Sequence, residues 1–563
     1  MAAERRIYSD RALTQLPRLL SLQDRNPFSP TYGCFNREFW LNKTLDFPSA
    51  IAQFGLHSLS LVYTHPFPDN VYYKQKKILD WALAGIEYWA KIQKNDGSFD
   101  EFYFNERGWA GPTAFLLYTV LDSYRMLKSE FPKDLEDEML KAAHKSALFL
   151  AKYDEPSVLA NHHAIAVLAI YEAYLVSRDK RLLDGMETRI RDFLRYCYDE
   201  GWSLEYGGAD PGYLSATVSF LGKLHKVYQD ERLYDVAKKA INFTSYFVYP
   251  NGFYAGTIGS RQTLHFYPDG YEIFAKDIPL AAAIAEKMLI ALGEGKLVPP
   301  EIQCDRYFLY RIPEFLLSYL DYKERNNQLS PLPCEAEPFD KFFDKAKIYL
   351  KKTPEYYLLV NLVKGGVAKL FNVREGKLIF NDCGIIAETS DSKVVTTQWV
   401  DDEYKISVNN SEISVAGGFH YIKFSQFTPI KMVIFRMAMI IFGWHTQLAY
   451  QIKGWIRKIL VWGAKPAPIK FLRKVSFDEK RLIITDRFEI NGNMNIKRLM
   501  IGDEFNHRFV PQSMYFQLQE LNISGFYLSR EMLDTLNNEK KLTLQRKVDL
   551  MGNIEVKVTR VSD

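Results

Sequence analysis

The sequence predicts a multidomain α + β protein, with an N-terminal (α/α) toroid (an incomplete helical barrel) followed by a C-terminal antiparallel β-sandwich. Three observations predict it. The 563 residues are too many for one ordinary domain. From about residue 45 to 325 apolar residues recur with the period of a helix, and after about residue 340 they alternate with a period of two. The hydrophobic content of 47% is enough to fill the cores of both halves.

The helical half consists of successive amphipathic segments. Each places apolar residues at i, i+3, i+4 and i+7, the stripe of a helix that packs on its neighbours. Several are apolar nearly all round, which favours an inner ring of helices. The segments are 76–93, 111–130, 135–153, 162–177, 213–228 and 278–294.

A loop signature recurs between these helices and indicates a repeat. Gly97, Gly201 and Gly252 lie in the similar stretches NDGSFDEFYF, DEGWSLEYGG and PNGFYAGTIG. Their separations of 104 and 51 residues both fit a unit of about 51 or 52 residues. A repeat of that length with two helices is typical of a helical array. If the array closes into a toroid, equivalent loops gather on one face.

The C-terminal half shows strand signals separated by Gly, Asn and Asp turns, which favour a sandwich of two antiparallel sheets. The predicted strand regions are 356–373, 377–388, 393–400, 404–419, 480–490, 540–550 and 554–561. The predicted domains are an N-terminal extension 1–44, the catalytic toroid 45–325, a proline-containing linker 326–341, and the sandwich 342–563 with a basic amphipathic helical insertion at about 427–474.

That insertion has an unusual charge distribution. Residues 414–477 contain ten Lys or Arg and no Asp or Glu. Within 429–470, Arg436 and Lys453 interrupt the apolar runs, which are therefore too short for a spanning helix of about 20 residues. Two interpretations stay open. The segment is either a helix lying in an anionic membrane surface, or a helical insertion packed on the toroid. Three tryptophans lie within it: Trp444, Trp455 and Trp462.

Composition excludes some classes and predicts a compartment. A net charge of +4 argues against a dedicated nucleic-acid binder. The five cysteines are scattered without a CxxC pair, which favours free thiols in a reducing compartment. The N-terminal stretch shows no secretory signal. The sequence therefore predicts a cytoplasmic protein, with peripheral contact at the inner face of the membrane left open.

The stretch LANHHAIAVLAIYEAY places polar residues ahead of an apolar helix. Asn161 is expected to cap a helix that begins at His162. A histidine in the first turn experiences the positive end of the helix dipole, which favours a neutral imidazole able to act as a base. We expect His162 to be functional and His163 to be structural. Repeat spacing places this stretch on the same face as the recurrent loops.

Two later loops on that face add candidates. In WSLEYGGADPGYLSATVSF, Tyr213 opens a helix and can relay protons, while Glu205 and Tyr206 can contact substrate. The long polar loop 256–275 offers Arg261, able to pair with a carboxylate, and then His265 and Tyr267. We therefore predict His162, Tyr213 and His265 as catalytic. The predicted substrate-binding residues are Asn161, Glu205, Tyr206, Arg261 and Tyr267. Neither a metal nor a cofactor is predicted, because no HxH, HExxH or nucleotide-binding motif accompanies these residues.

The toroid-and-sandwich order, together with ANHH at 160–163 and LEYGGADPGY at 204–213, resembles the heparinase II/III-like polysaccharide lyases and their alginate-lyase relatives. The resemblance implies β-elimination on an anionic, uronic-acid-containing polysaccharide or oligosaccharide. A base removes the C5 proton once the adjacent carboxylate is neutralised, and the C4–O leaving group departs. By position, Asn161 and His162 would hold the carboxylate and Tyr213 would be the base, the acid, or both.

One part of the family pattern is missing from the chain. The family's β-domain commonly supplies a histidine from a Gly-rich HxHAD-like stretch, but the matching region 361–373 contains no histidine. His420, His445 and His507 remain as isolated candidates; GGFH at 417–420 is expected to be only a turn in a strand region.

Three alternatives stay open besides the carbon–oxygen lyase. The first is a uronate C5-epimerase that modifies a bacterial-type exopolysaccharide during its synthesis, because epimerisation begins with the same proton abstraction. The second is a non-catalytic glycan-binding or polysaccharide-assembly protein. The third is a glycoside hydrolase that uses two carboxylates. Its candidates are Asp100, Glu101, Glu205 and Asp210.

Overall fold

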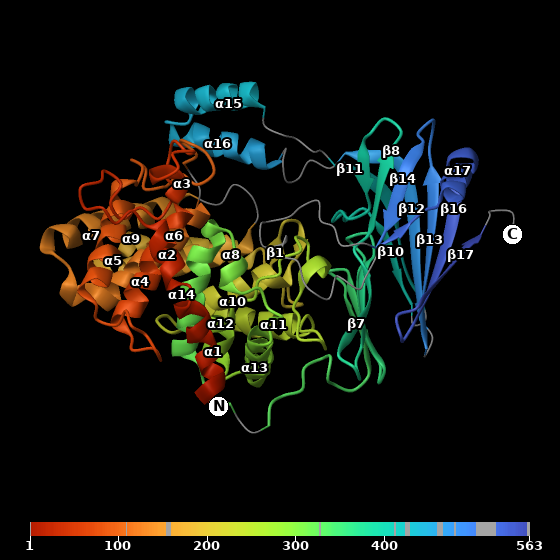
Figure 1. Cartoon of the computed structure of the whole chain (residues 1–563), viewed down its shortest axis with the longest axis horizontal. Helices are drawn as coiled ribbons and strands as arrows, with labels where there is room; N and C mark the ends of the chain where they lie inside the picture. The colour runs from red at the N-terminus through yellow and green to blue at the C-terminus, as the bar shows by residue number, and fades with distance from the viewer. Residues whose placement is uncertain are drawn as a thin grey trace.

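A computed structural model of the chain shows its fold. The structure describes residues 2–107, 110–153, 159–325, 328–409, 412–422, 428–458, 465–477, 480–502 and 525–559. Figure 1 shows a helical half and a sheet half side by side, with a pair of blue helices over one end of the helical half. The predicted class, a toroid followed by an antiparallel sandwich, is confirmed.

The inner layer of the toroid is a closed ring of helices. In ring order its members are α4 (Gly55–Thr64), α6 (Ala110–Leu127), α8 (Ala160–Ser177), α10 (Pro211–His225), α12 (Pro268–Phe274) and α14 (Asp305–Asp321). Each helix contacts the next, and α14 contacts α4. The sequence suggested an incomplete barrel, whereas the inner ring closes. The first residues of α6, α8 and α10 lie about one predicted repeat unit apart, so the repeat is confirmed.

An outer layer surrounds this ring. It consists of α5 (Lys76–Lys91), α7 (Lys133–Lys152), α9 (Lys180–Leu194), α11 (Glu231–Ser245), α13 (Pro279–Gly293) and α1 (Ala2–Leu13). The short helices α2 (Leu16–Leu22) and α3 (Arg37–Trp40) follow α1. The predicted N-terminal extension therefore contains a helix of the toroid, since α1 packs on α13 and α14. This cover explains why α13 is apolar nearly all round although it lies outside the ring.

The recurrent glycines form one repeated turn. The N–H groups of Gly97, Gly201 and Gly252 each donate to the carbonyl three residues earlier, at 2.9–3.0 Å. All three have positive φ, at 93°, 97° and 84°. A Cβ at Gly97 would lie 2.4 Å from the Lys145 carbonyl oxygen, so this turn requires glycine. Each turn connects an outer helix to the next inner one, which places the three loops at one end of the toroid.

The C-terminal half is a sandwich of two antiparallel sheets. The five-stranded sheet contains β3 (Phe339–Phe343), β4 (Ile348–Lys352), β5 (Tyr356–Asn361), β6 (Val367–Asn372) and β7 (Lys377–Asp382), in that order. The ten-stranded sheet of the described residues contains β8 (Ile385–Thr389), β9 (Val394–Thr396), β10 (Lys405–Val408), β11 (Glu412–Ile422), β12 (Pro466–Phe477), β13 (Arg481–Ile490), β14 (Ile496–Ile501), β15 (Phe526–Tyr527), β16 (Lys541–Asp549) and β17 (Ile554–Thr559). Helix α17 (Arg530–Glu539) packs against β14 and β16.

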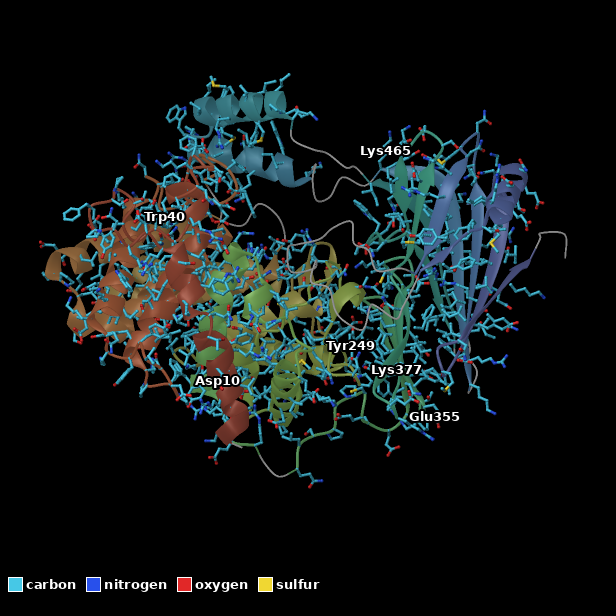
Figure 2. The ribbon with its side chains drawn as sticks, in the orientation of Figure 1. Asp10, Trp40, Tyr249, Glu355, Lys377 and Lys465 are labelled. Carbon is cyan, nitrogen blue, oxygen red and sulfur yellow. The ribbon has the colours of Figure 1, made fainter. Side chains whose placement is uncertain are left out.

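The five-stranded sheet is covered on both faces. Every residue of β5 is buried. Tyr357 and Leu359 belong to the core that continues into the toroid, whereas Leu358 belongs to the core between the two sheets. At the boundary, the Tyr357 hydroxyl donates to the Tyr246 carbonyl at 2.7 Å. The ring of Tyr249 stacks on Phe371 of β6 with centroids 4.8 Å apart. Figure 2 labels Tyr249 where the helical half meets the sheets. The sheet therefore fixes the sandwich against the toroid.

Several predicted boundaries need correction. Strand β3 begins at Phe339, inside the predicted linker; it was not predicted because it has only five residues and its two charged residues, Asp340 and Lys341, are adjacent rather than alternating with apolar ones. The last part of the predicted helical insertion is strand β12, in which Lys470 and Lys474 alternate with the buried side chains of Ile469, Phe471, Arg473 and Val475. The predicted turn GGFH lies within β11, where the pairing with β12 is irregular between Gly418 and His420.

The helical insertion itself is a hairpin of α15 (Pro429–Phe442) and α16 (Thr446–Arg457), and it packs on the toroid (Figure 1). Arg436 forms an ion pair with Asp46 at 2.8 Å, and Lys453 forms a buried one with Glu106 at 3.3 Å. Packing on the toroid, one of the two interpretations, is thus observed. Among the described residues, no helix is both long and apolar enough to span a membrane. Trp462 lies outside the described residues.

Candidate functional site

The inner helices begin at the same end of the toroid, and their first turns contact one another. His162 of α8 lies against Gly111 of α6, where an added Cβ would be 2.5 Å from the imidazole. The Tyr267 N–H, just before α12, donates to Ser215 Oγ in α10 at 3.1 Å. Tyr310 of α14 contacts Phe54, which precedes α4, with ring centroids 5.7 Å apart. The positive ends of the longer helices α6, α8, α10 and α14 therefore point toward one region.

Asn161 connects two of the predicted motifs. Helix α8 begins at Ala160 with Leu159 as its N-cap residue, so the predicted capping by Asn161 is wrong. The backbone N–H and the side-chain Nδ2 of Asn161 both donate to Glu205 Oε1 at 2.7 Å. Both residues are buried, at 2% and 0% exposure. Glu205 therefore fixes the orientation of the Asn161 side-chain amide. The capping prediction failed because Glu205 lies far from Asn161 in the sequence, where local capping rules do not apply.

The hairpin that carries Glu205 also places an aromatic ring beside a cation. Strands β1 (Leu204–Glu205) and β2 (Gly208–Ala209) are joined by Tyr206 and Gly207, both with positive φ, which makes a tight two-residue turn. The guanidinium of Arg261 lies over the Tyr206 ring, 4.2 Å from its centroid. This cation–π contact holds a positive charge at the half-buried edge of the site.

Tyr213 lies next to this pair at the start of α10. Its N–H donates to Asp210 Oδ1 at 3.1 Å, and its ring centroid is 5.5 Å from that of Tyr206. Burial raises the pKa of Tyr213 well above its ordinary value, as do the neighbouring Tyr206 and Tyr307, while the Arg261 cation opposes the shift. The half-buried Tyr213 is therefore a neutral hydroxyl at neutral pH, close to a cation that can stabilise its phenolate.

His162 and His163 have different surroundings. His162 is half-buried, with its ring edge-to-face on Phe115 at 5.6 Å between centroids. His163 is buried at 3% exposure against the Tyr196 ring. His162 is thus the histidine that lies at the contacting helix ends, whereas His163 packs inside the wall.

His265 and Tyr267 lie deeper than their polar loop suggested. His265 is fully buried, with ring contacts to Tyr267, Tyr307 and Tyr310. Burial lowers the pKa of His265 well below its ordinary value, and the nearby Arg311 cation lowers it further. Burial also raises the pKa of Tyr267 to about 12. Both side chains are therefore uncharged at pH 7. They lie buried beneath the first turns of the inner helices.

The start of α14 contributes residues that no sequence motif predicts. Arg306 forms an ion pair with Glu101 at 2.6 Å, and its Nη1 donates to the Tyr307 hydroxyl at 3.1 Å. Glu101 also accepts the N–H of Ile51 at 2.8 Å, so this carboxylate is used to hold loops and the arginine. The predicted ring of helices could have indicated this contribution, because every inner helix begins at this end of the toroid.

The sandwich approaches the same region through two loops. Buried Lys364 donates to the carbonyls of Thr257 and Gly259 at 2.9 and 2.7 Å. An added Cβ at Gly208 would lie 3.3 Å from Val400 Cγ1, so the loop after β9 contacts the β1–β2 hairpin. Beside Val400, Asp401 Oδ2 lies 3.1 Å from His420 Nε2. Each of these contacts forms within a fold that joins distant segments of the chain, so no local sequence pattern predicts them.

His420 is thus placed at the sandwich side of the region, where its ring also stacks on Trp399 with centroids 5.5 Å apart. His445 instead precedes α16 in the hairpin and is exposed. His507 lies outside the described residues. In the part of the chain that the structure describes, no group of three His, Cys, Asp or Glu could hold a metal ion.

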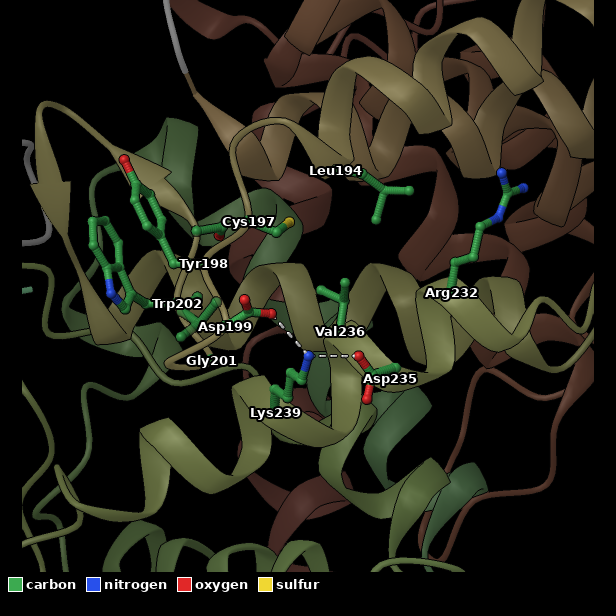
Figure 3. Close-up of a pocket in the computed structure, with 12 residues that line it drawn as sticks. Leu194, Cys197, Tyr198, Asp199, Gly201, Trp202, Arg232, Asp235, Val236 and Lys239 are labelled. Carbon is green, nitrogen blue, oxygen red and sulfur yellow. Dashed lines mark hydrogen bonds and ion pairs between the residues drawn. The ribbon is translucent and has the colours of Figure 1, made fainter. Parts of the chain in front are cut away.

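A separate cavity lies on the outer side of the toroid (Figure 3). It has a volume of about 280 Å³ between α9, α11 and the loop that carries Trp202. Lys239 forms ion pairs with Asp199 and Asp235 there, at 3.2 and 2.8 Å. None of the predicted site residues lines it. The cavity is therefore distinct from the helix-end region.

The chain was compared with known proteins. No protein-family model matches it, and neither does any curated protein. One similar solved structure is heparinase III, at 13% identity and a TM-score of 0.47, covering 88% of this chain and 72% of that chain. Another is chondroitinase AC lyase, at 11% identity and a TM-score of 0.45, covering 88% of this chain and 68% of that chain. A third is cellobiose 2-epimerase from Bacillus thermoamylovorans B4167, at 13% identity and a TM-score of 0.39, covering 56% of this chain and 99% of that chain. At such identities the chemistry of the site has to be inferred from its own side chains.

Proposed function

We propose that the protein is a carbon–oxygen lyase that cleaves a uronic-acid-containing glycan by β-elimination at the mouth of the toroid. The observation that carries the proposal is the double hydrogen bond from Asn161 to Glu205. It joins ANHH to LEYGGADPGY, the two motifs that resemble the lyase family, although they lie more than one helix apart in sequence. Tyr213, at the end of the second motif, then lies beside Tyr206 and Arg261.

The electrostatics of this region support an anionic substrate. The N-terminal ends of α6, α8, α10 and α14 point toward it, and Arg261 and Arg306 are half-buried beside it. Helix N-termini and guanidinium groups both stabilise a carboxylate. Because the C5 proton of a uronate becomes acidic only when the adjacent carboxylate charge is neutralised, such surroundings favour its removal. We assign the neutralising role to Asn161, His162 and Arg261.

Tyr213 is the proposed proton-transfer residue. As a phenolate stabilised by Arg261, it accepts the C5 proton; the C–H electrons then form the C4=C5 double bond as the C4–O bond breaks. The departing oxygen takes a proton, which the now neutral Tyr213 hydroxyl can donate, so the residue returns to its starting form. Glu205 acts as a positioning residue for Asn161, and buried His265 supports the floor of the site.

A test with candidate substrates distinguishes the lyase from the alternatives. The protein is incubated with alginate, heparan sulfate and chondroitin sulfate in ²H₂O, and ultraviolet absorbance and deuterium at C5 are measured. A lyase produces an absorbing unsaturated uronate at the new chain end. Deuterium at C5 without absorbance would instead establish the epimerase. Binding of a glycan with neither signal would leave only the non-catalytic role, and shortened chains without unsaturation would indicate a hydrolase.

The raised pKa of Tyr213 predicts the pH dependence of the reaction. If the free enzyme must lose the Tyr213 proton before it takes the C5 proton, the active fraction increases tenfold for each pH unit below that pKa. We therefore expect log kcat/KM to rise with a slope of about one between roughly pH 7 and 9.5, without a plateau. A profile that is flat over this range would show that another group is the base and that Tyr213 acts only as the acid.

A further inference from the structure

The outer face of α15 is apolar and exposed. Ile430 is 73% exposed, Ile434 is 65% exposed, and Trp444 just after the helix is 63% exposed. Within α15 itself, the side chain of Met439 is the one that is buried. A globular protein rarely leaves such a continuous apolar stripe in water without a binding partner. The exposed apolar residues of the hairpin are Ile430, Met432, Val433, Ile434, Met437, Ile440, Ile441, Phe442, Trp444 and Trp455.

The opposite face of the hairpin is firmly attached to the toroid. Phe435 packs on Tyr103 with ring centroids 5.1 Å apart, next to the ion pair of Arg436 with Asp46. Thr446 at the start of α16 donates to Asp96 at 2.7 Å. With the buried Lys453–Glu106 pair, these contacts use the inner stripe of both helices. The exposed stripe is therefore presented by an anchored element, and no rearrangement is needed to reveal it.

The charged residues of the hairpin itself have one sign. Residues 428–458 contain five Lys or Arg and no Asp or Glu. Of these, Lys431 lies exposed in the first turn of α15, and Lys458 lies exposed just after α16. An aliphatic stripe flanked by exposed lysines and by tryptophans is the composition of a helix at the interface of an anionic bilayer. Against a second copy of the same face, these positive charges would repel.

We propose that the α15–α16 hairpin binds the surface of an anionic lipid bilayer, with α15 lying in the plane of the headgroups. The apolar side chains insert among the upper acyl chains, and the lysines contact anionic headgroups. The hairpin docks on the loop containing Asp96 and Glu106, and Glu101 of that loop holds Arg306 at the candidate site. The bilayer would therefore lie at the same end of the toroid as the candidate site.

Vesicle binding tests the proposal without any glycan. The full chain is sedimented with vesicles of phosphatidylglycerol and phosphatidylcholine, and with vesicles of phosphatidylcholine alone. We expect binding to the anionic vesicles, at least tenfold weaker binding of Ile434→Glu/Ile441→Glu, and weaker binding of Lys431→Glu/Lys458→Glu. Ile290→Glu is the matched control, because Ile290 is 41% exposed on α13, and it should bind like the wild type. In the wild type, Trp444 and Trp455 should also give a blue-shifted emission that is lost in Trp444→Phe/Trp455→Phe.

Other results would overturn the proposal. Failure of the folded wild type to sediment with anionic vesicles would do so, as would equal binding of Ile434→Glu/Ile441→Glu. Equal binding to the neutral vesicles would overturn the assignment to anionic lipid. A wild-type dimer that becomes monomeric in Ile434→Glu/Ile441→Glu, without vesicle binding, would assign the face to a second copy of the chain. Circular dichroism of each variant verifies that it is folded.

Discussion

Tyr213→Phe is expected to lower kcat/KM on the active glycan by about 10²- to 10⁴-fold, the usual contribution of a positioned proton-transfer group. The substitution removes the hydroxyl but keeps the ring that packs on Tyr206 at 5.5 Å. The N–H of residue 213 still donates to Asp210, so the start of α10 is preserved. Initial rates from ultraviolet absorbance measure the effect, and thermal unfolding should be nearly unchanged.

A matched control isolates the chemistry from the loss of any hydroxyl. Tyr228→Phe makes the same change at a half-buried tyrosine just beyond the other end of α10. It should retain wild-type kcat/KM within about twofold, because surface-near substitutions without a special role have small effects. If Tyr213→Phe also retained most of the activity, Tyr213 would not transfer the proton and the proposed mechanism would be wrong.

The helical half was the part most accessible from sequence, and the reason is local. A left-handed glycine with a backbone carbonyl close behind it, followed by an apolar inner helix, occurs at both Gly97 and Gly201, two repeat units apart. Such signals are contained within about fifty residues and need no knowledge of distant partners. The sequence spacing therefore predicted both the ring and the end of the ring where the loops meet.

The candidate site could be predicted only in part, because its remaining contacts join distant segments. The motifs located Asn161 and Tyr213, but the Asn161 side chain binds Glu205 rather than its own helix, which local capping rules do not anticipate. Arg306 and Lys364 enter from the last inner helix and from the sandwich. Their positions depend on ring closure and domain packing, which a single sequence does not encode as a local pattern.

A buried cluster of charged residues between the two sheets also could not be predicted from local sequence patterns. Asp382 of β7, Arg473 of β12, Asp486 of β13 and Arg546 of β16 are all 2% exposed or less. Arg473 Nε lies 2.6 Å from Asp486, and Arg546 Nη2 lies 2.6 Å from Asp382 and 2.8 Å from Asp486. Burial alone would raise the pKa of Asp382, but the two arginines outweigh it and hold that pKa below its ordinary value. The cluster therefore joins the sheets as ion pairs in an apolar core.

Asp486→Asn is accordingly expected to reduce the free energy of unfolding of the sandwich by about 3–5 kcal/mol, since it leaves two buried arginines with one carboxylate. Urea unfolding followed by circular dichroism measures the loss. Glu489→Gln is the control on the same strand: Glu489 faces Lys541 at 3.8 Å, both side chains are about 40% exposed, and its loss should cost less than about 1 kcal/mol. In the wild type, the depressed pKa of Asp382 should add stability above the pKa of an unfolded aspartate, and this stability should disappear as the pH falls through the lower folded value. Equal small losses for Asp486→Asn and Glu489→Gln would show that the buried cluster contributes no more than an exposed pair.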